Sequence, residues 1–502
     1  MSEAEKLFKK LLDQVKIAAK FEYAASLLSW DQQTKMPTGG AEGRAEIYAV
    51  VKTEGFKRFT SDAVGEILEE LAGMEEKLEI EKQALVQRIS AIYQRSKTIP
   101  PDLFGAFSEA KSKGYSIWVE ARKKSDFKLF KPALEKIIEF TRQFAELYGY
   151  EKNPYDALLP DYEPGLTTED LRRIVSHLRR ELVPLVRSLT EQPNKPDETL
   201  LQGHFPEDLQ QQLSLQVLKA IGYDFNIGRL DTTAHPFTTS VGPDDVRVTT
   251  NFVVDKMAPA LFATIHEGGH ALYDQGKDPL VKWLYLDVGY SHGVHESQSR
   301  MWENMVGRSF PFWKFFYSRL QNILSHFRNI ALEDFYRAIN TVKPSPIRIY
   351  ADEVTYNLHI MLRFEIEEAL LRGEIEVEDL PELWNAKMHE YLGIVPENDA
   401  KGVLQDVHWS EGYFGYFPSY MLGNLYAAQL FAAAKRKIAN LEEEIAKGNL
   451  NILLKWLRAK VHRFGLTREA PDLLREVTGK GPTPEPWLDY VKEKFSNIYC
   501  VS

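Results

Sequence analysis

Apolar residues recur at three- and four-residue spacing over most of this sequence, a pattern that is typical of amphipathic helices. Prolines separate several of these segments, and the sequence contains neither a repeat of fixed period nor a linker-like stretch. It therefore predicts one mainly helical unit that spans residues 1–502. The clearest helical patterns cover residues 6–28, 63–89, 347–371 and 419–446.

One region departs from this pattern. Residues 226–255 are rich in Thr and Val and alternate in character, with the turn-forming sequence GPDD at residues 242–245 near their centre. Alternation around such a turn predicts a β-hairpin at about residues 230–254. The hairpin comes just before the helical segment that carries the most distinctive residues of the chain.

The composition makes several classes of protein poor candidates. The 502 residues carry 62 basic and 72 acidic side chains, a net charge of −10, so nucleic acid and anionic membranes are poor partners. The longest apolar stretch has ten residues, too few to span a membrane. The one cysteine, Cys500, permits neither a disulfide within the chain nor a cysteine-rich metal site. With charges spread through the first thirty residues, these features predict a cytoplasmic protein.

The sequence HEGGH at residues 266–270 carries the strongest chemical signal. His266 and His270 are four residues apart, so on a helix both imidazoles share one face and can bind one metal ion. Glu267 lies beside the first histidine, where it can act as a base on a water molecule. The two glycines between them weaken a helix by about 2 kcal/mol, so we expect them to allow close packing against a neighbouring segment.

A hydrolytic metal site of this type needs a third protein ligand and an open position for water. A helix that begins near residue 295 is the expected source. Glu296 and Arg300 are four residues apart there, so the guanidinium group can orient the carboxylate. Spacing alone does not separate Glu296 from Glu303. The candidates along this part of the chain are Asp287, His292, His295, Glu296 and Glu303.

Separated motifs along the chain resemble those of one family. They are WDQQTKMP (30–37), HPF (235–237), DVRVT (245–249), HEGGH (266–270), HESQSR (295–300), IRIYADEVTY (347–356), GVLQDVHW (402–409) and GYFPSYMLG (415–423). In this order they resemble the M32 family of metallocarboxypeptidases, the thermostable carboxypeptidase group. The resemblance covers nearly the whole chain, and is far more specific than the HEGGH sequence alone.

The resemblance implies a mainly α fold, with the grooved helical zinc-peptidase architecture of neurolysin and angiotensin-converting enzyme and a small β-sheet near the active site. It implies that His266, His270 and Glu296 bind one divalent metal, Zn²⁺ or in some members Co²⁺, and that Glu267 is the general base and acid. Members typically form homodimers and release single C-terminal amino acids with broad specificity. We therefore expect a homodimer that acts on peptides with a free C-terminus and binds neither nucleic acid nor membrane.

Three further residues are candidates for substrate binding. Arg348 suits the bidentate capture of a terminal carboxylate, although an ion pair with Asp352 is a purely structural alternative. By analogy with related peptidases, His408 and Tyr420 can donate to the oxyanion, whereas either side chain can equally belong to the core. The edge of the predicted hairpin is a further candidate, since extended peptides pair with edge strands; plain scaffolding is its alternative.

Other functions fit the same sequence less well. A metallo-oligopeptidase or a dipeptidyl carboxypeptidase on this scaffold would keep the metal site, but an endopeptidase gains nothing from a carboxylate clamp such as Arg348. An inactive peptide-binding protein has no physical need for Glu267 beside an open metal site. The sequence therefore favours a metal-dependent carboxypeptidase.

Overall fold

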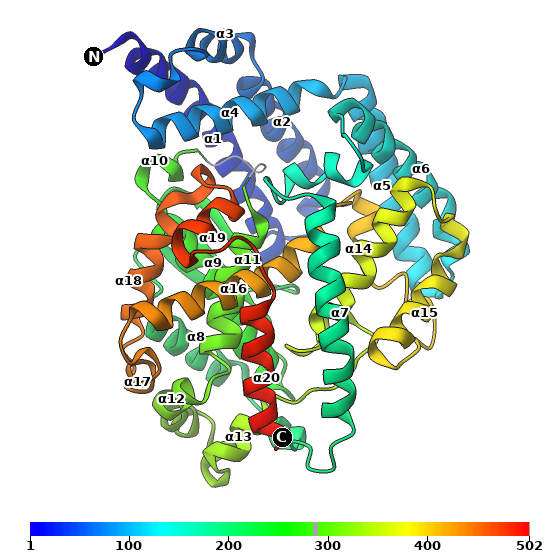
Figure 1. Ribbon diagram of the computed structural model, residues 1–502, viewed down its shortest axis with the longest axis vertical. Helices are drawn as coiled ribbons and strands as arrows, with labels where there is room; N and C mark the ends of the chain where they lie inside the picture. Colours follow the sequence, from blue (N-terminus) through cyan, green and yellow to red (C-terminus); the bar gives the residue numbers. More distant parts are fainter. Residues whose placement is uncertain (285–289, 501–502) are drawn as a thin grey trace.

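The computed structural model describes residues 1–284 and 290–500, which Figure 1 labels in chain order. The helices before the sheet are α1 (Glu3–Thr34), α2 (Ala41–Phe59), α3 (Asp62–Leu71), α4 (Ile80–Thr98), α5 (Pro101–Lys124), α6 (Phe127–Tyr148), α7 (Thr168–Thr190) and α8 (Glu207–Ile221). The strands are β1 (Gly228–Thr232), β2 (Thr238–Gly242) and β3 (Asp245–Thr250). The helices after the sheet are α9 (Met257–Gly276), α10 (Pro279–Lys282), α11 (His292–Arg300), α12 (Phe310–Ile323), α13 (Leu332–Ala338), α14 (Tyr356–Arg372), α15 (Leu380–Leu392), α16 (Phe417–Lys437), α17 (Leu441–Ala446), α18 (Asn451–Lys460), α19 (Ala470–Thr478) and α20 (Glu485–Tyr499).

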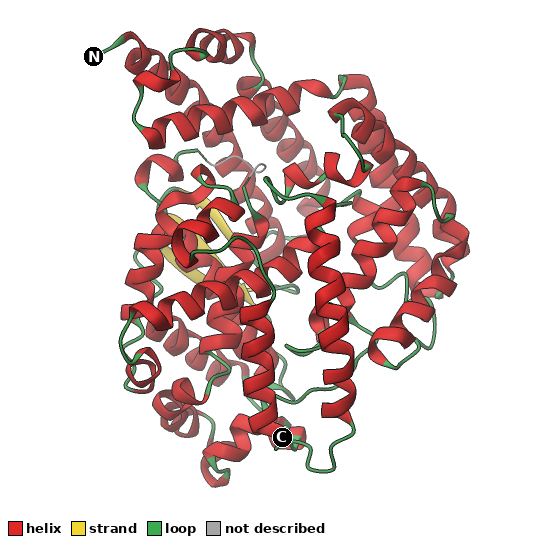
Figure 2. Cartoon of the chain, in the orientation of Figure 1, coloured by secondary structure: helices red, strands yellow, loops and turns green. Residues whose placement is uncertain are grey.

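The prediction of a mainly helical fold with a small sheet is confirmed (Figure 2). The N-terminal helices α1 to α4 form a layer at the top of Figure 1, and the C-terminal helix α20 packs against the long helix α7. None of the described helices combines the length and the apolar character needed to cross a membrane.

Three of the predicted helical segments contain breaks. The segment 63–89 forms two helices because Gly73 adopts a left-handed conformation, with φ at +85°, between them. Asn440, with φ at 55°, similarly separates α16 from α17. In the segment 347–371 a regular helix begins only at Tyr356, because the Asp352 side chain accepts hydrogen bonds from two main-chain amides just before it. Apolar spacing continues across such breaks and does not reveal them.

The predicted hairpin is confirmed for β2 and β3. These strands are antiparallel across the turn at residues 242–245, with Thr238 opposite Val248 and Ser240 opposite Val246. The structure adds β1, which runs parallel to β3 and was not distinguished in the hairpin prediction. The strand order β1-β3-β2 leaves β2 at an edge of the sheet, where it packs against α9.

Two hydrophobic clusters form the core of the described residues. The larger one extends from Phe107 to Tyr499 and includes most of the buried side chains of α9 and α16. The smaller one belongs mainly to α1, α3 and α4. At the end of α1, the Trp30 ring lies 4.2 Å from the guanidinium carbon of Arg247 on β3, so the N-terminal layer contacts the sheet. Because packed interiors resist deformation, the large core gives α9 and α16 fixed positions.

Candidate metal centre

Helix α9 carries the HEGGH sequence and is buried along most of its length. It packs against α8, β3 and α11. A Cβ atom on Gly268 would lie 2.7 Å from a leucine side chain of α8, and one on Gly269 would lie 2.6 Å from the main chain of α11. The close packing expected of the two glycines is confirmed. Contact with α11, which the glycines allow, compensates for their poor helix propensity.

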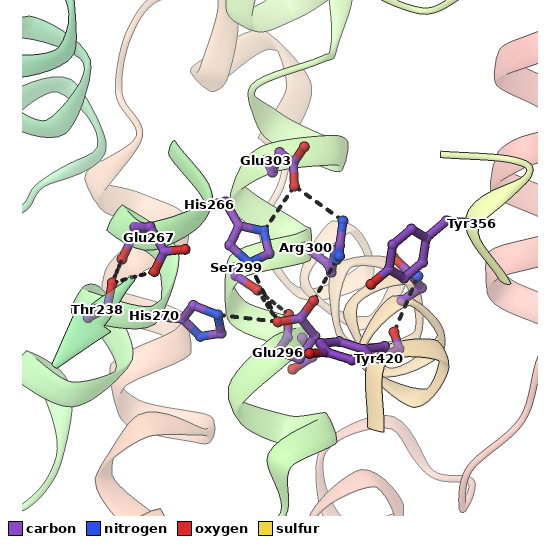
Figure 3. A network of polar contacts seen from close by, with 12 residues as sticks. Thr238, His266, Glu267, His270, Glu296, Ser299, Arg300, Glu303, Tyr356 and Tyr420 are labelled. Carbon is purple, nitrogen blue, oxygen red and sulfur yellow. Dashed lines mark hydrogen bonds and ion pairs between the residues drawn. The ribbon is translucent and has the colours of Figure 1, made fainter. Parts of the chain in front are cut away.

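The structure brings His266, His270 and Glu296 together (Figure 3). Glu296 Oε2 lies 3.2 Å from His270 Nε2 and 3.6 Å from His266 Nε2. Ligand atoms from the three residues all lie within 4.8 Å of one another. Two imidazole nitrogens and one carboxylate oxygen form the protein donor set of many catalytic zinc sites, so these residues fit a divalent metal ion.

Glu296 is held by its own helix and by α16. Arg300, one turn further on, donates from Nε to Glu296 Oε1 at 2.7 Å. The Ser299 hydroxyl lies 2.6 Å from the Glu296 main-chain carbonyl and 3.1 Å from Oε2, so it donates to one of the two. On the other side, a Cβ atom on Gly423 of α16 would lie only 2.7 Å from Glu296 Cβ. The predicted contact between Arg300 and Glu296 is confirmed, and the position of the carboxylate also depends on a glycine more than a hundred residues away.

Glu303 occupies a different position from the ligand group. It lies in the π-helix Met301–Val306, which continues α11, and accepts a hydrogen bond from His266 Nδ1 at 2.9 Å. Burial raises the pKa of Glu303, but the His266 hydrogen bond and the charges of Arg300 and Arg308 lower it to about 2. The ionised carboxylate fixes the tautomer of His266 and leaves its Nε2 lone pair directed toward Glu296.

Two of the remaining candidates for the third ligand, His295 and His292, are not members of the group. The His295 ring stacks on His270 with 4.3 Å between the ring centroids. Burial lowers the pKa of His295 to about 4, so this ring is neutral near pH 7. His292 stacks on Tyr290 with 4.5 Å between the centroids, and Asp287 lies outside the described residues.

The charges around the ligand group favour a cation. Burial lowers the pKa of His266, but the Glu296 charge and the Glu303 hydrogen bond outweigh this effect and raise it. Burial raises the pKa of Glu296, yet Arg300 and His266 hold it well below its usual range. The carboxylates therefore stabilise positive charge at this position. A metal ion has to displace the His266 proton, because an imidazole binds a metal in its neutral form.

The Glu267 side chain extends from α9 toward the edge strand β2. The Thr238 hydroxyl on β2 is 2.8 Å from Glu267 Oε2 and also 2.8 Å from the Glu267 main-chain carbonyl, so it donates to one of the two (Figure 3). Thr238 is not among the site residues expected from the sequence. Its only signal was its position directly after the HPF motif.

Arg348 is buried, and two side chains hold its guanidinium group. Nε and Nη2 lie 3.0 and 2.9 Å from Asp406 Oδ1, and Nη1 donates to the Tyr356 hydroxyl at 2.9 Å. The structural alternative considered for Arg348, an ion pair with Asp352, is wrong. Asp352 instead accepts main-chain hydrogen bonds just before α14. Asp406 lies in the GVLQDVHW motif, but the sequence did not indicate which residue it would pair with.

Asp406 joins two arginines. Arg363, fully buried on α14, donates from Nε to Asp406 Oδ2 at 2.7 Å. Burial raises the pKa of Asp406, but Arg348 and Arg363 hold it far below its usual range. One carboxylate between two guanidinium groups leaves an excess of positive charge, which suits a bound carboxylate.

The other two predicted substrate-binding residues lie beside Arg348. His408 Nε2 is 3.2 Å from the Tyr420 hydroxyl, and the guanidinium carbon of Arg348 lies 4.9 Å from the centre of the Tyr420 ring. Burial lowers the pKa of His408 to about 3, so its ring is neutral near pH 7. Arg348, His408 and Tyr420, which come from three separate segments, thus form one cluster.

Tyr356 links this cluster to the group of His266, His270 and Glu296. The guanidinium carbon of Arg300 lies 4.4 Å from the centre of the Tyr356 ring, whose hydroxyl binds Arg348. Figure 3 shows Tyr420 next to Glu296 and Tyr356 next to Arg300. Tyr356 therefore contacts both Arg300, which holds Glu296, and Arg348.

Comparisons with known proteins match the chain over nearly its whole length. The family model described as "Carboxypeptidase Taq (M32) metallopeptidase" matches residues 10–495. The chain is 42% identical to "Carboxypeptidase 1" of Bacillus subtilis, over 98% of this chain and 99% of that protein. It is 40% identical to "Thermostable carboxypeptidase 1" of Thermus thermophilus, over 99% of each.

The fold agrees with these matches. The crystal structure of an M32 carboxypeptidase from Deinococcus radiodurans superposes with a TM-score of 0.95 at 36% identity, covering 99% of this chain and 100% of that one. Sequence and structure thus agree on one family, and the resemblance drawn from the separated motifs is confirmed. The chain belongs to the M32 family of metallopeptidases and is a metal-dependent carboxypeptidase.

Proposed function

We propose that His266, His270 and Glu296 hold the divalent metal, most naturally Zn²⁺ and alternatively Co²⁺, and that the enzyme releases single C-terminal amino acids with broad specificity. The observation that carries this proposal is the convergence of three ligand atoms within 4.8 Å beside Glu267. Membership of a metallopeptidase family implies a divalent metal. Imidazole and carboxylate donors suit Zn²⁺ and also accept Co²⁺.

Glu267 acts as the general base and acid in this proposal. When bound, a divalent cation supplies Lewis acidity, which lowers the pKa of water and polarises the scissile carbonyl. Glu267 takes a proton from the attacking water and passes it to the leaving amine. Thr238 restrains the carboxylate for this transfer through its hydroxyl, 2.8 Å from Oε2.

Arg348 binds the terminal carboxylate of the substrate. Its three described hydrogen bonds use three of its five N–H groups and leave one on each Nη nitrogen. With one N–H group on each Nη nitrogen, Arg348 can donate to both oxygens of a substrate carboxylate. Asp406 and Tyr356 hold the guanidinium plane in place, so little side-chain entropy is lost when the substrate binds.

His408 and Tyr420 stabilise the developing oxyanion. The neutral His408 ring and the Tyr420 hydroxyl form one hydrogen-bonded pair, in which either group can be the donor. Tyr420 lies beside Glu296 (Figure 3), and the guanidinium carbon of Arg348 lies 4.9 Å from the centre of its ring. A donor there is close to where charge develops on the scissile carbonyl.

Strand β2 binds the main chain of the peptide. It is an edge strand beside α9, and Thr238 ties it to Glu267. Main-chain pairing at such an edge does not depend on side chains, which supports broad specificity.

We further propose that residues 1–502 act as one catalytic unit and that the enzyme is a homodimer, as the family resemblance implies. We also propose that it is cytoplasmic, as its single cysteine supports.

Two N-terminally blocked peptides that differ only at the C-terminus, one a free acid and one amidated, test the function. We expect stepwise loss of single residues from the free acid alone, read by mass spectrometry. A chelator should abolish this activity, and Zn²⁺ or Co²⁺ should restore it. Internal cleavage of both peptides would contradict the assignment and favour an oligopeptidase. No cleavage with either metal would favour a binding protein.

A further inference from the structure

Glu163 is a buried carboxylate against the first turn of α11. It lies in the loop after the short 3-10 helix Leu159–Asp161 and is completely inaccessible to solvent. The Ser291 hydroxyl donates to Glu163 Oε2 at 2.8 Å, and the Gly293 amide donates to Oε1. Both described donors are neutral, so Glu163 does not belong to a simple ion pair with them.

These contacts complete the hydrogen bonding of the N-terminus of α11. The amides of a first helical turn have no partner inside the helix. Here the His292 amide donates to the Tyr162 carbonyl at 2.9 Å, the Gly293 amide to Glu163, and the Val294 amide to Ser291 Oγ at 2.9 Å. Because Ser291 in turn donates to Glu163, two of the three amides depend on this carboxylate.

Glu296 lies close to the end of α11 that Glu163 contacts. It belongs to the turn directly after the capped one, and the π-helix Met301–Val306 continues α11 beyond Arg300. On its flanks α11 packs without spare room against α9 at Gly269 and against α16 at Gly423 (Figure 1). Those contacts fix the distance of α11 from its neighbours, whereas the Glu163 contacts fix its position along its own axis.

Keeping this carboxylate buried has a cost. Burial raises the pKa of Glu163 to about 7, although the hydrogen bonds from Ser291 and Gly293 lower it. A side chain that only filled space would avoid this cost, since an apolar residue of similar size needs no hydrogen bonds. The polar contacts therefore serve to hold the α11 terminus in one position.

We propose that Glu163 is a positioning residue for the metal ligand Glu296, and that it sets the affinity of the site for its divalent ion. This inference rests on the proposed role of Glu296. Metal–ligand distances tolerate only about 0.2 Å, so a small shift of α11 along its axis weakens binding. Partners that orient ligands from outside the coordination shell typically change metal affinity by 10- to 100-fold.

The test measures the Zn²⁺ dissociation constant of the full-length apoprotein by competition with a chromophoric chelator. Glu163→Gln should weaken Zn²⁺ binding by about tenfold. The glutamine side chain has an NH₂ group in place of one acceptor oxygen, so it loses the hydrogen bond from one of the two donors. Glu367→Gln is the matched control. Glu367 is also fully buried, has a pKa raised to about 7, and accepts from Tyr155 and Trp409 at 2.8 Å, away from α11. The Glu367→Gln variant should bind Zn²⁺ with wild-type affinity.

A third variant separates the two proposals. Glu296→Ala should lose tight Zn²⁺ binding; if it binds normally, the proposed ligand set fails. If Glu296→Ala loses the metal and Glu163→Gln keeps wild-type affinity, only the positioning role of Glu163 is overturned. Equal weakening by Glu163→Gln and Glu367→Gln would also overturn it, because the effect would then be general destabilisation.

A second pair of variants covers the case in which Glu163→Gln does not fold, as judged by the thermal unfolding of the apoprotein. Ser291→Ala removes the hydroxyl that links the Val294 amide to Glu163, and Ser291→Thr keeps a hydroxyl. We expect weaker Zn²⁺ binding in the alanine variant and recovery in the threonine variant. Wild-type affinity in the alanine variant would overturn the proposal.

Discussion

The ligand group and the arginine cluster lie side by side but are assembled in different ways. His266, His270 and Glu296 come from two helices that are close in sequence, and Arg300 orients the carboxylate from one turn away. Arg348, in contrast, depends on partners far along the chain, such as Asp406. One group is built from local helix geometry, and the other from the packing of distant segments.

The two groups also differ in charge. In the proposed ligand group, ionised carboxylates such as Glu296 and Glu303 favour a cation. In the arginine cluster one carboxylate, Asp406, serves two guanidinium groups, Arg348 and Arg363, and favours an anion. Neighbouring regions of opposite preference suit a substrate whose scissile carbonyl lies one residue from a terminal carboxylate. The comparison therefore predicts that changes in the ligand group affect all substrates, and changes in the arginine cluster only free acids.

The largest expected effect belongs to the ligand group. Glu267→Gln keeps the shape of the side chain but removes the base, so kcat should fall by at least ~10²-fold. Metal content, measured by elemental analysis, should stay at one ion per chain. Free-acid peptides with different C-terminal residues should all lose activity by the same factor. Near-normal turnover would remove Glu267 from the mechanism.

A smaller and more selective effect is expected for Arg348→Ala. Loss of a buried charged hydrogen-bond donor costs about 2 to 5 kcal/mol, so kcat/KM for free-acid peptides should fall by at least about 30-fold. The rate on matched amidated peptides should change little, which would reduce the preference for a free C-terminus. Arg348→Lys keeps the charge but loses the planar guanidinium group, so it should recover only part of the preference for a free C-terminus. Equal losses on both peptides would make Arg348 structural.

Glu303→Gln should weaken metal binding by about tenfold. The amide oxygen still accepts from His266 Nδ1, but the negative charge that holds this imidazole is lost. Chelator competition measures the change. The KM of free-acid peptides for the metal-saturated enzyme serves as the control and should stay unchanged. A changed KM would contradict the division between the two groups.

The smallest expected effect is on stability and applies to both regions. Glu163 beside α11 and Glu367 beside Trp409 each have a pKa raised to about 7 by burial. For an acid whose pKa is higher in the folded state, stability is greatest below the unfolded pKa and falls as pH rises through the folded one. Replacement by glutamine removes this titration. The Tm of Glu367→Gln relative to wild type should therefore rise by a few degrees between pH 5 and pH 8; a constant difference would contradict the raised pKa.

Much of the site could be predicted from local spacing. Residues four apart on a helix share a face because main-chain hydrogen bonds fix the helical period. This argument places His266 beside His270, and Arg300 beside Glu296, without knowledge of the fold. The same kind of argument predicts the β2–β3 hairpin, since its turn sequence is local. Apolar spacing did not predict the helix ends near Gly73 and Asn440, where one left-handed residue ends a helix although the spacing continues.

The sequence by itself therefore determined the mainly helical fold, the HEGGH platform and the small set of residues able to complete it. Tertiary structure alone decided that Glu296 faces the two imidazoles while Glu303 lies behind His266. It also decided that Arg348 pairs with Asp406 instead of Asp352. The physical reason is that spacing within a helix is set by hydrogen bonds over four residues, whereas the partner of a distant side chain depends on how the whole core packs.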